Sequence, residues 1–178
     1  MQLQGIDISE DAVEFCRKQG LSVERVRELR NYCHAFSGQK FDFIIMSHLL
    51  EHIPKNEMIE TLRLIREHLL SEMGQLFVAV PNAMSNTGAY WAYEDFSHET
   101  LFTSGSLLFV LRAAGFKNIL FLDPNGTAGS VSLIRWIKLA LLFLYKLNFN
   151  FWNVVTDSAF HRPSPQILSY ELKALATA

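Results

Sequence analysis

Apolar positions in the first thirty residues come in short runs separated by polar turns. Met1–Ile6 is predicted to form a strand that ends at Asp7. Ser9 is typical of a helix N-cap and Gly20 of the residue just past a helix, so a helix is predicted between them. The next apolar positions predict a short strand near Leu21–Val26.

The stretch Phe41–Met46 is almost continuously apolar. Its β-branched and aromatic residues predict a strand buried on both faces, as in a parallel sheet. Asn56 is expected to cap an amphipathic helix that ends at Gly74, and Gln75–Val80 is predicted to be a second buried strand. This alternation is typical of an α/β fold, a doubly wound and mostly parallel sheet with helices on both faces.

The second half of the chain continues the pattern less regularly. Ala83–His98 is expected to be a loop, followed by a helix that Thr103 or Ser104 caps. Strands are predicted over Lys117–Leu122 and, loosely, over Gln166–Ala176.

The most apolar segment, Val131–Trp152, is interrupted by Arg135, Lys138 and Lys146. These cations fall on one side of a helical wheel, which predicts a basic amphipathic helix rather than a membrane span. It could lie on a membrane surface, act as a lid, or form a contact in a homo-oligomer. We therefore expect one domain over 1–178 with a helical insertion at about 127–162.

Composition narrows the classes of partner. The net charge of −2 gives no basic excess for nucleic acid, so no nucleic-acid partner is expected. Cys16 and Cys33 lie in unrelated contexts, which favours a reduced intracellular protein. The first twenty residues lack the apolar core of a signal peptide. A cytoplasmic location is expected, with membrane association through the amphipathic helix left open.

Polar side chains cluster just after the strand at Phe41–Met46. Open α/β sheets bind ligands at the carboxyl ends of their strands, so a site is expected here. His48, Glu51 and His52 also match H-x-x-E-H, a zinc-hydrolase signature. That signature belongs inside a long helix, whereas this one follows directly on a strand and is cut by Pro54, so a metal-binding hydrolase is kept only as a minor alternative.

Five motifs occur in order and together resemble class I S-adenosylmethionine (SAM)-dependent methyltransferases. The most similar subgroup acts on small molecules and glycans, and the resemblance covers Leu3–Leu122. The motifs are Gly5-Ile6-Asp7-Ile8-Ser9, Phe41-Asp42-Phe43-Ile44-Ile45, His48-Leu49-Leu50-Glu51-His52-Ile53-Pro54, Gly74 to Asn82, and His98 to Phe116 with Phe102-Thr103, Leu107 and Ala114-Gly115.

The resemblance implies a Rossmann-like fold whose last strand is antiparallel, and a function. A methyl group would pass from SAM to a hydroxyl of a small molecule or glycan. Asp7 with the adjoining Ile8 would bind the ribose of SAM, since a carboxylate offers two acceptor oxygens to a vicinal diol. Ser47 and His48 would line the methionine side.

His52 and His98 are the candidate catalytic residues, because an oxygen nucleophile benefits from a base near neutral pKa. His52 is the candidate base and His98 the candidate contact to the acceptor. The aromatic loop Tyr90–Phe96 and the helix Val131–Trp152 would shape the acceptor pocket.

The chain departs from the family at its start. The family's first strand and Gly-rich loop should lie roughly twenty to thirty residues before Asp7, and no G-x-G occurs anywhere in the sequence. We therefore expect an N-terminally truncated domain, impaired in activity, that binds SAM weakly and is unstable or pairs through another chain. A degenerate, non-catalytic partner subunit is the alternative.

A divalent ion is a further open alternative. Some ubiquinone-pathway O-methyltransferases carry Glu-x-x-Glu-His at this position and bind such an ion. In this chain His48, Glu51 and His52 occupy the corresponding positions. The main prediction assigns no metal ligand.

Overall fold

The computed structural model describes residues 3–159 and 164–178. At its start, β1 (Gly5–Asp7) pairs in parallel with β2 (Val23–Arg25), and α1 (Glu10–Lys18) connects them. The Ser9 side chain caps α1 by accepting a hydrogen bond from the Ala12 backbone N–H at 3.3 Å. The predicted cap and helix are confirmed, whereas the strand is shorter than predicted, since Leu3 and Gln4 lie outside it. The part of the expected Met1–Ile6 strand at residues 1–2 lies outside the described residues.

A second sheet forms the body of the molecule, in the order β3-β4-β6-β5. Its strands β3 and β4 are parallel, and β6 runs antiparallel to both of its neighbours. The antiparallel last strand agrees with the fold that the resemblance implies. The bounds are β3 (Phe41–Ser47), β4 (Leu70–Pro81), β5 (Lys117–Leu122) and β6 (Glu171–Thr177).

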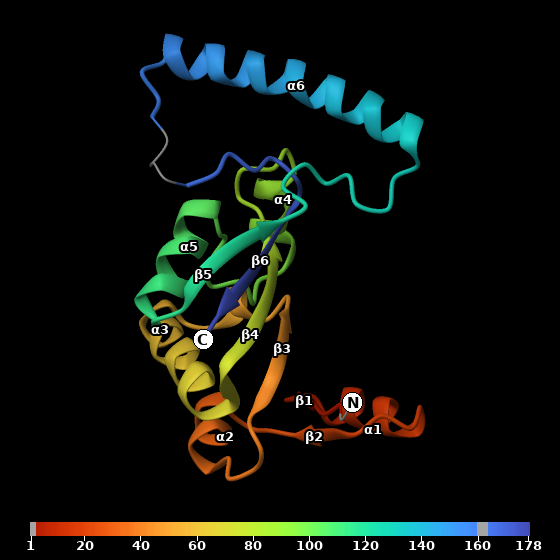
Figure 1. Cartoon of the computed structure of the whole chain (residues 1–178), viewed down its shortest axis with the longest axis vertical. Helices are drawn as coiled ribbons and strands as arrows, with labels where there is room; N and C mark the ends of the chain where they lie inside the picture. The colour runs from red at the N-terminus through yellow and green to blue at the C-terminus, as the bar shows by residue number, and fades with distance from the viewer. Residues whose placement is uncertain (1–2, 160–163) are drawn as a thin grey trace.

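Three helices, α2 (Leu29–Ala35), α3 (Lys55–Leu64) and α5 (Ser104–Ala113), supply the core on one face of this sheet (Figure 1). A π-helical turn (Ile65–Leu69) follows α3 directly. Thr103 caps α5 in a capping box, as predicted. The helix α2 was not predicted, because its seven residues have too little apolar periodicity.

The prediction that β3 is buried on both faces is wrong. Met46 is buried, but Phe43 and Ile45, on the opposite face, are 49% and 65% exposed. Because successive strand residues point to opposite faces, only one face of β3 meets the core. The helix predicted from Asn56 begins instead at Lys55 after Pro54, and Gly74 lies inside β4 rather than at a helix end.

The two sheets leave a gap between β1 and β3. Within the described residues, β1 pairs only with β2, and β3 pairs only with β4. Figure 1 shows β1, β2 and α1 beside the lower end of β3, with their strands running across its direction. One edge of β1 and one edge of β3 are therefore without a strand partner in the part of the chain that is described.

Two helices lie beyond the carboxyl ends of β3 and β4. The expected Ala83–His98 loop contains α4 (Gly88–Glu94). The predicted basic helix is α6 (Ser132–Val155), which spans the top of Figure 1 away from the sheet. The last residues of the expected insertion, 160–162, lie outside the described residues. No described helix has the length and apolar character needed to cross a bilayer.

Candidate functional site

His48 stands at the carboxyl end of β3 and is held from two sides. Its backbone has a φ of 49°, a left-handed conformation that is uncommon for a residue with a side chain. Its Nε2 lies 2.9 Å from Oε1 of Glu171, the first residue of β6, and its Nδ1 lies 3.3 Å from Oε1 of Glu51. Such backbone strain is concentrated at functional sites in proteins.

Glu51 is completely buried in the short 3-10 turn Leu50–His52. Neither of its carboxylate oxygens has a hydrogen-bond partner within the described part of the chain, since the approach of His48 lacks hydrogen-bond geometry. The Glu51 carbonyl accepts hydrogen bonds from the backbone N–H groups of Glu99 and Thr100 at 2.8 and 3.1 Å. A buried carboxylate without hydrogen-bond donors is costly, so a cation beside it would stabilise this site.

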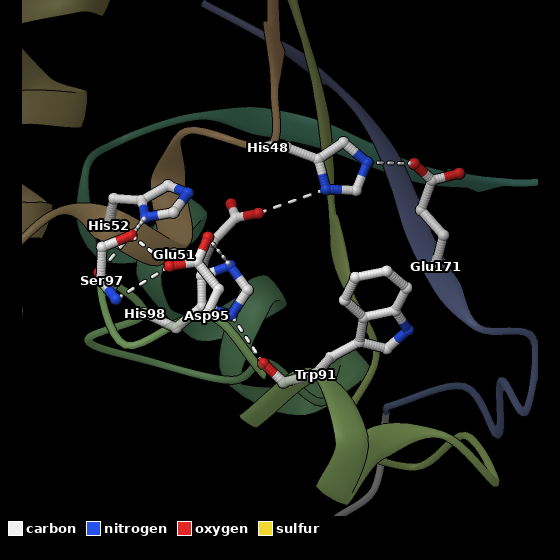
Figure 2. A network of polar contacts seen from close by, with 8 residues as sticks. All are labelled: His48, Glu51, His52, Trp91, Asp95, Ser97, His98 and Glu171. Atoms are coloured by element: carbon white, nitrogen blue, oxygen red, sulfur yellow. Dashed lines mark hydrogen bonds and ion pairs between the residues drawn. The ribbon is translucent and has the colours of Figure 1, made fainter. Parts of the chain in front are cut away.

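The rings of His52 and His98 meet, with centroids 4.8 Å apart, although 45 residues lie between them in the chain. His98 Nδ1 is 2.8 Å from the Trp91 carbonyl oxygen. A carbonyl only accepts, so this nitrogen carries the proton and Nε2 keeps its lone pair in the neutral ring. Figure 2 shows these rings beside Glu51, with His48 turned toward Glu171.

Ser97 fixes the tautomer of His52 in the same way. Its Oγ donates to Asp95 Oδ1, so toward His52 Nδ1, 3.0 Å away, it can only accept. The Ser97 carbonyl lies 3.2 Å from the same nitrogen. The proton therefore sits on Nδ1, and Nε2 of His52 is a second available lone pair.

Asp95 keeps its negative charge beside the two rings. Hydrogen bonds from the Ser97 side chain and backbone N–H hold the pKa of Asp95 below its ordinary value, and the nearby His98 and His52 act in the same direction. Its Oδ2 is 3.8 Å from Nε2 of His98. Asp95 is thus ready to stabilise a positive charge that forms on His98.

Glu51, His52 and His98 each place one potential ligand atom within 4.8 Å of the others. The cluster offers a carboxylate and two imidazole nitrogens, which suits proton transfer or a divalent transition metal. The H-x-x-E-H chelate is not formed, because His48 lies on the strand end rather than on a helix with His52. The hydrolase alternative therefore has no support in the geometry.

Asp7 and Ile8 are not part of this cluster. Asp7 ends β1, and its Oδ1 accepts a hydrogen bond from the Ser9 N–H at 2.7 Å; the side chain of Ile8 is 67% exposed. Ser47, by contrast, ends β3 next to His48. Of the residues predicted from the sequence, the structure brings together Ser47, His48, His52 and His98, and it leaves Asp7 and Ile8 across the gap between the sheets.

Sequence reasoning missed Glu171, Asp95, Ser97 and the Trp91 carbonyl. Nothing in the local sequence marks Glu171, which reaches His48 only because β6 inserts beside β4. Asp95 and Ser97 carried a detectable signal, since an aspartate that accepts from the residue two positions on is a common turn-forming pattern.

Asn82, directly after β4, has a structural role. It is fully buried, and its Nδ2 donates to the carbonyls of Ile167 and Ser169 at 2.9 and 2.7 Å. Its Oδ1 accepts from the Met84 N–H at 3.0 Å. Asn82 therefore ties the end of β4 to the segment that leads into β6.

Comparison with known proteins identifies the family. A sequence model described as "Methyltransferase domain" matches residues 2–120, two thirds of the chain. The chain belongs to this family of methyltransferase domains. No curated protein matches the sequence.

Solved structures share the fold at low sequence identity. A SAM-dependent methyltransferase from Archaeoglobus fulgidus is 19% identical and superposes with a TM-score of 0.67. The match covers 98% of this chain and 75% of the Archaeoglobus chain. A SAM-dependent methyltransferase from Thermotoga maritima is 17% identical with a TM-score of 0.62, and the match covers 98% of this chain and 72% of the Thermotoga chain. The plantazolicin methyltransferase BamL, solved with SAH, is 15% identical with a TM-score of 0.57, and the match covers 99% of this chain and 68% of the BamL chain. These likenesses establish the mixed α/β, Rossmann-like methyltransferase fold.

Proposed function

We propose that this domain transfers a methyl group from SAM to a hydroxyl of a small molecule or glycan. The observation that carries the proposal is the meeting of His52 and His98 at the carboxyl end of β3, beside Ser47 and His48. In open α/β sheets this edge is where ligands bind. Ser47 and His48 would hold the methionine side of the cofactor, while Asp7 and Ile8 would hold its ribose.

When bound, SAM supplies a methyl group already activated on a sulfonium. The protein's task is then to align the acceptor, exclude water and remove one proton. The acceptor hydroxyl would lie against Nε2 of His98 or His52, whose Nδ1 protons are fixed by the Trp91 carbonyl and by Ser97. The Asp95 carboxylate stabilises the imidazolium that results.

Methyl transfer can be tested without knowing the acceptor. The chain, extended by the residues encoded in frame before Met1, is incubated with SAM labelled in the methyl group and with separate extracts of water-soluble small molecules and of lipids. The proposal predicts that the label enters a product in one of the two extracts. This product should be stable to base, because methylation of a hydroxyl gives an ether. Label only in amines, thiols or base-labile esters would contradict the hydroxyl acceptor.

We propose further that one additional strand fills the gap between β1 and β3. Two unpaired strand edges and the exposed apolar side chains of Phe43 and Ile45 support it. So does the lack of any G-x-G in the sequence, because that loop follows the first strand of the family. The strand could come from residues encoded upstream or from a second chain, and without it Asp7 and His48 do not share one pocket.

The upstream reading frame separates this proposal from its alternative. An in-frame acidic-x-Gly-x-Gly-x-Gly motif before Met1 would support a clipped enzyme. A stop codon there would favour the non-catalytic partner subunit. A monodisperse, cooperatively melting monomer of these 178 residues would count against the need for another strand.

A divalent-metal site is the second candidate, favoured by the buried Glu51 carboxylate, which lacks a hydrogen-bond donor within the described residues, and by the facing nitrogens of His52 and His98. After incubation with Mn²⁺ or Zn²⁺ and desalting, we expect one ion per chain by elemental analysis. The variant Glu51→Gln keeps the shape but removes the charge, and should weaken binding by about a hundredfold.

The control for the metal site is His68→Asn. His68 contacts the ring of His34, away from the cluster, so this variant should keep the ion. Equal metal retention in Glu51→Gln and the wild type, or none in the wild type, would rule out the site.

A further inference from the structure

The helix α6 makes its hydrogen bonds to the body of the protein from one side. Tyr145 donates a hydrogen bond from its hydroxyl to Asn86 Oδ1 at 2.7 Å, and Lys146 Nζ donates to Asn125 Oδ1 at 3.1 Å. Asn150 accepts from Gln166 at 2.9 Å. No residue of α6 is buried. Figure 1 shows the helix lying across the molecule, away from the sheet.

The opposite side of α6 is apolar and exposed over its whole length. At about 100° per residue, roughly half of the circumference carries only apolar side chains apart from Asn148. Representative exposed fractions are 72% for Leu133, 69% for Trp136, 62% for Leu141 and 60% for Phe151. Soluble monomers rarely expose a continuous apolar surface of this extent, so something covers it.

The charges on α6 indicate which kind of surface covers its apolar side. Arg135, Lys138 and Lys146 are its only charged residues, so the helix is purely cationic in a chain whose net charge is −2. All three lie on the polar side of the helix, where Lys138 Nζ donates to Ser130 Oγ at 3.3 Å and Lys146 bonds Asn125. Long basic side chains next to the apolar side can reach back to a surface that this side has entered. Trp136 and Trp152 stand near the two ends, and tryptophan favours the boundary between lipid and water.

We propose that the outer side of α6 lies on the surface of a lipid bilayer with anionic headgroups. A second copy of α6 fits less well, because helix–helix contacts cover a narrow stripe and would leave much of this apolar half exposed.

Docking on a membrane has a consequence for the acceptor, and this part rests on the proposed methyl transfer. Asn86, which binds Tyr145 of α6, belongs to the same connection between β4 and α5 that presents Trp91 and His98. Docking of α6 therefore brings that connection close to the headgroups. The acceptor hydroxyl then belongs to a lipid-linked molecule held in the bilayer.

The test is co-sedimentation of the 178-residue chain with vesicles of phosphatidylcholine, alone or mixed with phosphatidylglycerol. The wild type should sediment with the mixed vesicles. The double variant Leu141→Glu/Leu144→Glu should bind about tenfold less or weaker still, because it places two charges in the apolar side. Arg135→Glu/Lys138→Glu should lose the preference for anionic lipid.

Met73→Glu is the matched control, since Met73 is 80% exposed on β4, away from α6. Circular dichroism checks that each variant is folded. Failure of the wild type to sediment, or equal sedimentation of the α6 double variant, overturns the proposal. So does a soluble dimer that only the α6 variants dissociate. Vesicle binding with methyl label confined to water-soluble products would keep the docking and overturn the lipid-linked acceptor.

Discussion

Replacing Asn82 by alanine is expected to lower the free energy of unfolding by about 3–5 kcal/mol. The substitution removes three hydrogen bonds at a fully buried position and leaves the carbonyls of Ile167 and Ser169 without their donor. Because Asn82 is fully buried, bulk solvent does not reach the groups that lose their partners. Urea denaturation followed by fluorescence of the tryptophans measures the change, with the slope of the transition unchanged.

Asn125→Ala provides the comparison for Asn82→Ala. Asn125 makes one surface hydrogen bond, with Lys146, so its loss should cost less than about 0.5 kcal/mol. If Asn82→Ala cost less than about 1 kcal/mol, the proposed tie between β4 and the segment before β6 would be wrong.

His98→Asn is expected to lower the turnover number for methyl transfer by about a hundredfold to ten-thousandfold, the usual contribution of a general base. Asparagine can still contact the Trp91 carbonyl but cannot accept a proton at the position of Nε2. KM for SAM should change little, because His98 is proposed to lie on the acceptor side. The measurement is the initial rate of label transfer into the acceptor fraction identified above.

The same assay separates His98 from a structural histidine. His68→Asn should keep wild-type turnover. A larger loss in His52→Asn than in His98→Asn would assign the base to His52, the candidate that the sequence indicated. If the two site variants are each nearly inactive and the double variant is no worse, the rings act as one unit. Less than about a threefold loss in His98→Asn would exclude a catalytic role for this ring.

Much of the fold could be predicted from local pattern. The Ser9 cap of α1, the Thr103 cap of α5 and the apolar run of β3 each act through their immediate neighbours, so the sequence contains their signal. The exposed face of β3 could not be read in this way. The same apolar run suits a central strand or an edge strand, and the difference depends on whether a neighbour pairs with it.

The site was predictable in part. His48 and His52 follow a strand end, and His98 precedes a capped helix, so all three could be named. Glu171 could not, because it meets His48 only through the antiparallel insertion of β6 beside β4. The lack of a hydrogen-bond donor for the Glu51 carboxylate within the described residues also appears only in three dimensions, since it depends on which donors reach a buried side chain.

The gap between the sheets concerns the proposed cofactor most. Asp7 and His48 are proposed to hold opposite ends of SAM, yet they stand on separate sheets, each beside a strand edge that is unpaired among the described residues. A strand between those edges would continue the parallel pairing on both sides and bring its following loop to the cofactor. The proposed SAM site therefore requires Asp7 and His48 to be two halves of one pocket.

A calorimetric titration of SAM tests this directly, on the 178 residues alone and on the same chain with the residues encoded in frame before Met1. We predict affinity no tighter than about millimolar for the chain alone. The extended protein should bind SAM with micromolar affinity, which Asp7→Ala weakens by about a hundredfold. Micromolar binding by the 178 residues alone, or equal binding with and without the Asp7 carboxylate, would contradict the account.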